Sequence, residues 1–329
     1  MRARSLGFVS IGLVAAAFVI CGLAFGADMR SYVSGNLFLT IDGVNAGFIK
    51  AFSGGGIFSE VINEPSGPSY FTKKHIGQPR YEPVSIQVGF SNAKGVYDWI
   101  RASWNTTNQY KNVRVTQADF KLEAKSVRDY QRCLIEETTI PAMDSTSREP
   151  AYMTLKLVPE TIREEQGDGS KVSGEFGKNE QKIFLPSNFK LEIDGLDCTK
   201  VNKIDAFTVK RQMATDDIGA ARDSQKEPGK MEFPDLKITV AEVSSDSWKQ
   251  WFDDFVVKGN NDESKEKSGT LTLLSADRAI ILARINFHNM GIYRIERAAA
   301  EANSDQIARV TVDLYVESMD FQYLNKVIQ

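Results

Sequence analysis

The chain contains nearly the same ten-residue phrase twice, "NLFLTIDGVN" at Asn36–Asn45 and "NFKLEIDGLD" at Asn188–Asp197. The 152-residue displacement between positions 36 and 188 also matches further buried-type and turn-type residues, namely Ile49 with Val201, Phe52 with Ile204, Gly77 with Gly229, Ile86 with Ile238, Val88 with Val240 and Trp99 with Trp251. Later the displacement becomes 158 and then 157, where "MTLKLVPET" matches "VTVDLYVES". Internal similarity over this length indicates one structural unit built twice.

Both copies predict the same order of elements. An opening strand alternates apolar residues and ends at an Asp-Gly pair, where Gly43 or Gly195 supplies the positive φ of a tight hairpin turn. A polar, glycine-containing excursion follows, and then a second alternating strand through Val84, Ile86 and Val88 or through Leu236, Ile238 and Val240. About three more strands complete each copy.

Each copy contains one amphipathic helix after its second alternating strand. Apolar residues at spacings of three, four and seven form its stripe, namely Val96, Trp99, Ile100 and Trp104 in the first copy and Trp248, Trp251, Phe252, Phe255 and Val256 in the second. Side chains before the helices are predicted to cap them, namely Ser91 or Asn92 and Ser244, Ser245 or Asp246. The tryptophans could stack a sugar or a base, but their helical spacing favours core packing.

These patterns predict a mainly β (α+β) protein of two tandem antiparallel β-sandwich or barrel units, each with one packed helix. The predicted boundaries are 27–162 for the first unit and 187–329 for the second. Residues 163–186 are the predicted linker, because the run from Arg163 to Lys182 is polar, rich in glycine and almost free of aliphatic residues.

The first 26 residues are typical of a secretory signal peptide. Arg2 and Arg4 precede an uncharged apolar run that ends in small residues, which predicts cleavage after Gly26. The run is also near the length of a retained membrane anchor, the less favoured alternative, so contact with a membrane is expected only through this segment and only if it is not cleaved. We therefore expect an exported protein in the periplasm, on the cell surface or outside the cell. Export permits a disulfide between Cys133 and Cys198, although two unpaired thiols are favoured.

The element order resembles the contractile phage tail tube protein family. The residues that carry the resemblance are "FLTIDGVNAGF", "KKHIGQPRYEPVSIQVGF" and "YDWI" in the first copy, and "FKLEIDGL", "EPGKMEFPDLKITV" and "WKQWF" in the second. The resemblance implies the fold shared by phage tail tubes and the type VI secretion tube, in which protomers form stacked six-membered rings. It implies that the chain's main partner is itself, that other tail-like or envelope components are further partners, and that three double chains form a pseudo-six-fold ring. We assign the ring contacts to Gly54–Thr72 and Arg211–Lys226.

The sequence predicts no catalytic, cofactor-binding or metal-ligating residue. His75 and His288 lie outside metal-ligand spacings, and "SGGGIF" at Ser53–Phe58 lacks the Gly-Lys-Ser/Thr ending of a phosphate loop. The adjacent acids Glu136-Glu137, Asp216-Asp217 and Asp253-Asp254 are predicted to point apart and to be solvated. The net charge of -3 suggests no nucleic-acid partner.

Two functions from different classes fit these observations. The first is a non-enzymatic structural protein, exported and tail tube-like, that assembles into rings or tubes. The alternative is a monomeric periplasmic or secreted β-sandwich binding module. The two copies share apolar faces, turn glycines and a helix tryptophan, but no matched acid–base group, so an enzyme is disfavoured.

Overall fold

The structure is a computed structural model, which describes residues 35–65, 71–90, 92–172, 183–217, 223–298 and 307–327. The predicted signal peptide lies outside these residues. Within them, no helix combines the length and the apolar character needed to cross a membrane. We call residues 35–172 the first repeat and residues 183–327 the second repeat.

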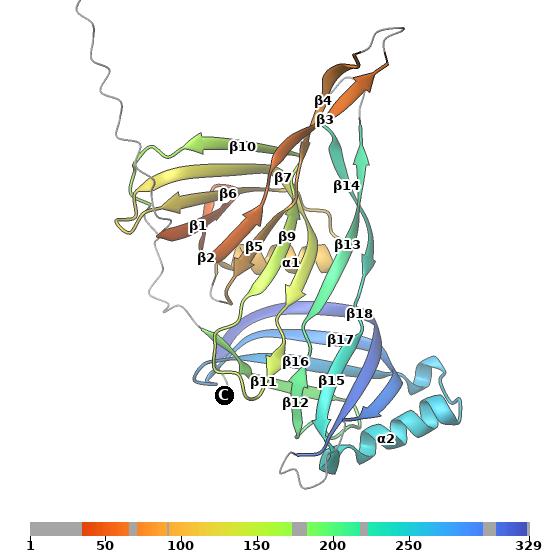
Figure 1. Cartoon of the computed structure of the whole chain (residues 1–329). Coiled ribbons are helices and arrows are strands. Elements are labelled where there is room, and N and C mark those ends of the chain that lie inside the picture. Colours follow the sequence, from red (N-terminus) through yellow and green to blue (C-terminus); the bar gives the residue numbers. More distant parts are fainter. Residues whose placement is uncertain are drawn as a thin grey trace, which may run out of the picture. The chain divides into compact units, whose positions relative to one another are not determined.

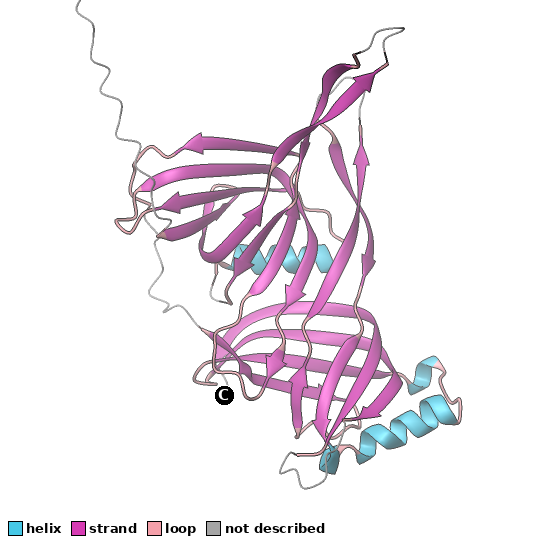
Figure 2. Cartoon of the chain, in the orientation of Figure 1, coloured by secondary structure: helices cyan, strands magenta, loops and turns pink. Residues whose placement is uncertain are grey.

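Antiparallel strands make up most of both repeats (Figure 2). In the first repeat a six-stranded barrel closes through the pairs β7–β6, β6–β1, β1–β2, β2–β5, β5–β9 and β9–β7. Its strands are β1 (Asn36–Ile41), β2 (Val44–Gly54), β5 (Val84–Val88), β6 (Lys111–Ala118), β7 (Ala124–Ile140) and β9 (Met153–Val158). The predicted mainly β fold is confirmed.

The second repeat has the same strand order in an antiparallel sheet, β11-β16-β17-β18-β15-β12 (Figure 1). Its strands are β11 (Phe184–Ile193), β12 (Val201–Ile204), β15 (Leu236–Ala241), β16 (Lys267–Ser275), β17 (Ile280–Arg297) and β18 (Arg309–Val327). Among the described strands, β12 pairs β15 and β8 (Met143–Asp144) but not β11, whereas the matching strands β1 and β2 pair directly. The second repeat therefore takes a short strand from the first at this position.

The repeated Asp-Gly turns have the predicted backbone. Gly43 and Gly195 have φ of 78° and 73°, a region that costs other residues steric strain. Leu39 and Leu191 precede these turns and point into buried cores. The recurrence of the opening phrase thus reflects one strand and turn used twice.

The two repeats also share a β-bulge at equivalent positions, which the sequence analysis did not predict. In β7 the partners step from Lys111↔Cys133 to Val113↔Tyr130, and in β17 they step from Lys267↔Met290 to Gly269↔Phe287. Arg132 and Asn289 occupy the two bulges with φ of 50° and 52°. Bulges of this kind bend a strand and re-aim its side chains.

The predicted helices form, but Asn92 and Ser245 do not cap them, and the predicted alternative Ser91 lies outside the described residues. Helix α1 (Lys94–Trp104) begins after Ala93 without a side-chain cap, because the Asn92 side chain instead donates to the carbonyls of Ala46 and Phe48. Helix α2 (Asp246–Phe252) begins after Ser245, whose hydroxyl donates to the carbonyl of Glu242. In both cases the side chain that was expected to cap the helix instead donates to a backbone carbonyl, which lies in a distant strand for Asn92 and in the preceding turn for Ser245.

The four tryptophans of the two helices are buried, which confirms that they pack in the core. After α2 the chain continues as the π-helix η2 (Asp253–Val257), and two 3-10 turns flank the pair, η1 (Glu242–Ser244) and η3 (Glu263–Lys265). Val256 at the end of the predicted stripe is 42% exposed, whereas the matching Trp104 is buried. The two helices therefore differ in what covers their ends.

Each predicted excursion folds as a hairpin. The first is β3 (Ile57–Glu64) with β4 (Lys73–Tyr81), and the second is β13 (Phe207–Asp216) with β14 (Gln225–Glu232). Their registers match, because Phe58↔Arg80 and Lys210↔Glu232 are equivalent pairs at the 152-residue displacement. The two hairpins are therefore equivalent parts of the two repeats.

The start of the predicted linker is part of the first repeat. Residues Thr161–Gln166 form β10, which pairs with β7, and the backbone N–H of Val172 donates to the carbonyl of Leu122. The polar composition of this stretch reflects an outer strand whose side chains mostly face solvent. The expected linker residues 173–182 lie outside the described residues.

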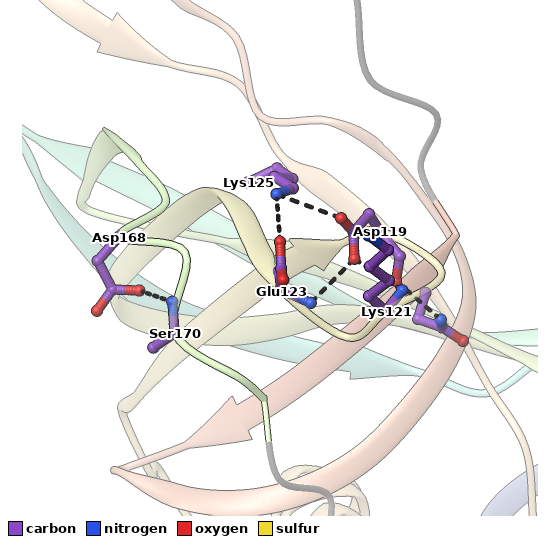
Figure 3. A network of polar contacts seen from close by, with 7 residues as sticks. Asp119, Lys121, Glu123, Lys125, Asp168 and Ser170 are labelled. Carbon is purple, nitrogen blue, oxygen red and sulfur yellow. Dashed lines mark hydrogen bonds and ion pairs between the residues drawn. The ribbon is translucent and has the colours of Figure 1, made fainter.

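A polar network stabilises the turn against which this segment lies (Figure 3). The Asp119 carboxylate accepts hydrogen bonds from the backbone N–H groups of Lys121 and Glu123 at 2.8 and 3.0 Å, and it lies 3.2 Å from the Lys125 ammonium. The hydrogen bond from Glu123 is the main cause that lowers the pKa of Asp119. The network thus holds the β6–β7 turn, and Asp168 accepts from the N–H of Ser170 beside it.

Candidate assembly interface

The hairpin of the second repeat joins the sheet of the first (Figure 1). Strand β13 pairs with the end of β7, from Phe207↔Ile140 to Lys210↔Glu137. The hydroxyls of Thr139 and Thr208 lie 2.9 Å apart across this pair. An edge strand of one repeat is thereby covered by the other, which removes an unpaired row of backbone groups.

Side chains extend this contact along the hairpin. The backbone N–H of Lys226 donates to Glu160 at 3.2 Å, and the Tyr110 hydroxyl donates to the Lys226 carbonyl at 2.9 Å. The Arg211 guanidinium donates to the Asn108 side-chain oxygen at 2.5 Å. Burial lowers the pKa of Lys226 and of Arg211 from their ordinary values, which shows that the contact is partly shielded from water.

Helix α1 of the first repeat packs on β18 of the second. Tyr97 stacks on Tyr323 with ring centroids 4.0 Å apart and planes 8° apart. Trp104 meets Phe321 edge-on at 5.6 Å and Phe233 at 6.5 Å. These aromatic contacts supply the apolar part of the contact between the repeats.

The loop between β7 and β9 supplies a third contact. In it, β8 pairs with β12 through Ile204↔Met143, and Met143 is fully buried. The N–H of Ala151 also donates to the carbonyl of Phe184 at 3.1 Å. We call these three contacts, made by β13–β14, by α1 and by β8, the internal joint.

The hairpin of the first repeat has no strand partner outside itself among the described residues, although Arg80 lies 3.4 Å from Asp217 and the Tyr81 hydroxyl donates to Asp223 at 2.9 Å. Strands β3 and β4 pair only with each other. Ile57 is 53% exposed, whereas the equivalent Val209 is 2% exposed because it lies in the internal joint. Further apolar side chains of this hairpin are also exposed, namely Phe58, Val61, Ile62 and Ile76. Such a cluster on one hairpin is typical of an interaction site.

The segment of β17 that is equivalent to the end of β7 likewise has an edge that no described strand pairs with. Residues Arg294–Arg297 of β17 pair with β18, and no described strand pairs with their other edge. Ile295 lies opposite Val312, as Thr138 lies opposite Leu155, so Arg294–Arg297 is equivalent to Glu137–Ile140. The chain therefore contains one filled hairpin-to-edge contact and, among the described residues, a second hairpin and a second strand edge that have no such strand partner.

The structure separates the two segments that the sequence assigned to ring contacts. Arg211–Lys226 contributes to the internal joint, whereas the described part of Gly54–Thr72 is exposed. Sequence reasoning missed the contact of α1 with β18. The sequence contained one indication of this contact: the first helix has the aromatic Tyr97 where the second helix has Lys249 at the equivalent position.

The histidines and cysteines that the sequence analysis considered as metal-binding or reactive groups do not cluster in the structure. His75 lies 2.9 Å from Glu64 on the exposed hairpin, and His288 is exposed on β17. No group of metal-ligating side chains occurs in the described part of the chain. Cys133 and Cys198 are free thiols, and burial raises the pKa of both.

One adjacent acid pair differs from its prediction. Glu136 and Glu137 both contact the Lys156 ammonium, at 3.0 and 3.2 Å, instead of pointing apart. A register shift between Ile135 and Glu137 turns the two side chains toward the same lysine. The pair is thus an ion-pair cluster at the internal joint.

Comparison with known proteins relates the second repeat to a family. Residues 185–320 match the family model described as T4-like virus tail tube protein gp19. No curated protein matches the chain. The family match confirms the tail tube resemblance for the second repeat, and the equivalent hairpin registers and bulges relate the first repeat to it.

Solved structures with a similar fold each correspond to less than half of this chain. The PVC extracellular contractile injection system, in its extended sheath-tube complex, matches at TM-score 0.38 and 15% identity, covering 42% of this chain and 94% of that chain. The tube-terminating cap of the anti-feeding prophage matches at 0.37 and 20%, covering 44% and 99%. Hcp1 from Flavobacterium johnsoniae matches at 0.25 and 15%, covering 43% and 98%.

Proposed function

We propose that this tail tube-like chain is an exported structural subunit that assembles with copies of itself into rings or tubes. The observation that carries the proposal is the internal joint, in which the second repeat docks on the first through strand pairing and aromatic packing. A joint between two similar units, with both complementary halves left exposed, supports continued head-to-tail addition.

Heterologous contacts of this kind generate either a closed ring or an open filament. Because each chain supplies two repeats, three chains would close a ring of six repeats with pseudo-six-fold symmetry. The predicted signal peptide supports assembly outside the cytoplasm, in the periplasm, at the surface or beyond the cell. Other tail-like or envelope components are the expected further partners.

The proposal is tested by the mass of the chain from Ala27 onward in light scattering over a concentration series, with negative-stain images of the same sample. We expect trimers, rings or tubes. A monomer at every concentration would contradict assembly and would favour the alternative, a binding module that presents its hairpins to a ligand.

A further inference from the structure

The β3–β4 hairpin and the edge of β17 at Arg294–Arg297 are equivalent to the two sides of the contact between β13 and β7. They therefore fit as the two sides of one interface between different copies of the chain. Within the chain, Val209 of β13 lies opposite Thr138 of β7. Ile57 is equivalent to Val209, because the hairpin registers match at the 152-residue displacement. Ile295 is equivalent to Thr138, because both lie opposite equivalent residues of the next strand.

A second, independent correspondence lies beyond the strand pairs. Glu160 accepts from the N–H of Lys226 in the internal joint, and it also accepts from the Arg132 guanidinium at 2.5 Å. In the second repeat Glu317 accepts from the Asn289 amide at 2.8 Å, in the equivalent bulge. Glu317 thus accepts from a side chain of the equivalent bulge, as Glu160 does, although its donor is an amide where Glu160 has a guanidinium, and no described hairpin N–H donates to it.

The residue that would supply this N–H is Lys74. It lies opposite Asn63 in the first hairpin, as Lys226 lies opposite Thr215 in the second. Lys74 and Glu317 are both exposed, whereas Glu160 is 7% exposed. The difference in exposure is the one expected between an unfilled and a filled copy of the same interface.

We propose that β3 of one copy adds as an antiparallel strand to the edge of β17 in a second copy, with Ile57 opposite Ile295 and the Lys74 N–H bound to Glu317. The partner is thus a second copy of this chain, and the inference rests on the proposed function. The pairing buries Ile57, as the internal joint buries Val209, and places Phe58 opposite Arg294, a pair suited to a cation–π contact. It also covers an unpaired strand edge.

The backbone before β3 permits this docking. Gly54 and Gly55 have φ of 82° and 74°, whereas the equivalent Ala206 and Phe207 have no positive φ. The first hairpin therefore leaves its barrel in a different direction from the second. Only glycine adopts such φ values without steric strain, and hydrogen bonds from Gly55 N–H to the Pro83 carbonyl and from Glu82 N–H to the Gly56 carbonyl hold the segment in this direction.

The test is a disulfide between chains. Two proteins, Ile57→Cys and Ile295→Cys, are prepared from Ala27 onward in a Cys198→Ser background and co-expressed, with an affinity tag on one. Opposed residues of an antiparallel pair have Cα atoms about 4.5–5.5 Å apart, which suits a disulfide. We expect a covalent heterodimer on oxidation, with a disulfide between positions 57 and 295 in the peptide map.

Two controls use the repeat itself. Thr138→Cys with Val209→Cys in one chain probes the same pair in the internal joint and should form a disulfide within the chain. Ile76→Cys replaces Ile57→Cys in the negative control, because Ile76 is 78% exposed on the other strand of the same hairpin. This protein should give no specific link to position 295.

The outcomes distinguish the inference from the proposed function. If light scattering shows oligomers and the internal control forms its disulfide, but no link joins positions 57 and 295, then this interface is wrong and assembly uses another surface. If the protein is monomeric at every concentration and no link forms, both proposals fail.

A second measurement is the strength of association between chains. Glu317→Ala should weaken association about tenfold, corresponding to the loss of one hydrogen bond to a charged group. Glu263→Ala, at an exposed position on η3, should leave association unchanged.

Discussion

Tyr97 of α1 stacks on Tyr323 of β18 with a centroid separation of 4.0 Å, and so links a helix of the first repeat to the last strand of the second. We expect a double-mutant cycle of Tyr97→Ala and Tyr323→Ala to give a coupling free energy of about 0.5–1.5 kcal/mol. Urea unfolding at a fixed low protein concentration measures it. In a parallel cycle, Tyr97→Phe should retain most of the coupling because it keeps the ring, and equal loss in both cycles would contradict stacking as the cause.

Glu160 and Glu317 are equivalent carboxylates in filled and unfilled interfaces. Glu160→Gln should lower the free energy of unfolding by about 1–3 kcal/mol, because the buried carboxylate accepts from both Arg132 and Lys226. Glu317→Gln is the matched control and should change it by less than about 0.5 kcal/mol, as at most exposed sites. The prediction fails if the two substitutions cost the same in chemical unfolding of the unassembled chain.

Substitutions at the equivalent residues Val209 and Ile57 should affect different properties, the first the stability of the fold and the second the assembly of chains. Val209→Asp places an unpaired charge in the internal joint and should destabilise the fold by about 3 kcal/mol or more. Ile57→Asp should leave the midpoint of thermal unfolding of the unassembled chain nearly unchanged, but it should reduce the oligomer mass in light scattering. A folded, fully assembling Ile57→Asp protein would argue against a role for β3.

Asp119 should contribute to stability in a pH-dependent way. Its folded-state pKa lies below the ordinary value of 3.8, mainly because of the hydrogen bond from the Glu123 N–H, so its contribution is present above pH 3.8. The contribution is lost as pH falls through the folded-state pKa. We therefore expect Asp119→Asn to be less stable than the native chain at pH 7, and the difference to shrink below pH 3.8 in urea titrations. A difference that persists unchanged at pH 2 would point to packing and not to charge.

Cys198 should react slowly with alkylating reagents. Burial raises the pKa of its thiol to about 11 from 9.0, so its thiolate fraction at pH 8 is about a hundredfold smaller than that of an ordinary thiol. Mass spectrometry of iodoacetamide labelling should show a rate that keeps rising between pH 8 and pH 10. An unfolded sample in urea is the control and should label quickly at pH 8.

The sequence by itself determined the local elements and their repetition. Period-two alternation before Asp42-Gly43, the stripe around Trp99 and Trp251, and the constant displacement between the two copies depend on neighbours within one element, so they are visible in a linear string. The capping prediction for Asn92 failed because an acceptor distant in sequence, the Ala46 carbonyl, took its side chain. The preference for a local cap is a weak one that tertiary contacts override.

Only the tertiary structure decided how the two copies meet. Gly54–Thr72 and Arg211–Lys226 are similar excursions in the sequence, yet the second lies against the first repeat while most of the described part of the first is exposed. Glu160 and Glu317 likewise occupy equivalent positions beside equivalent bulges, and a hairpin N–H donates to Glu160. Pairing between strands far apart in the chain depends on which edges remain open once the sheets of the two repeats have formed. The periodicity within a single strand carries no information about those edges.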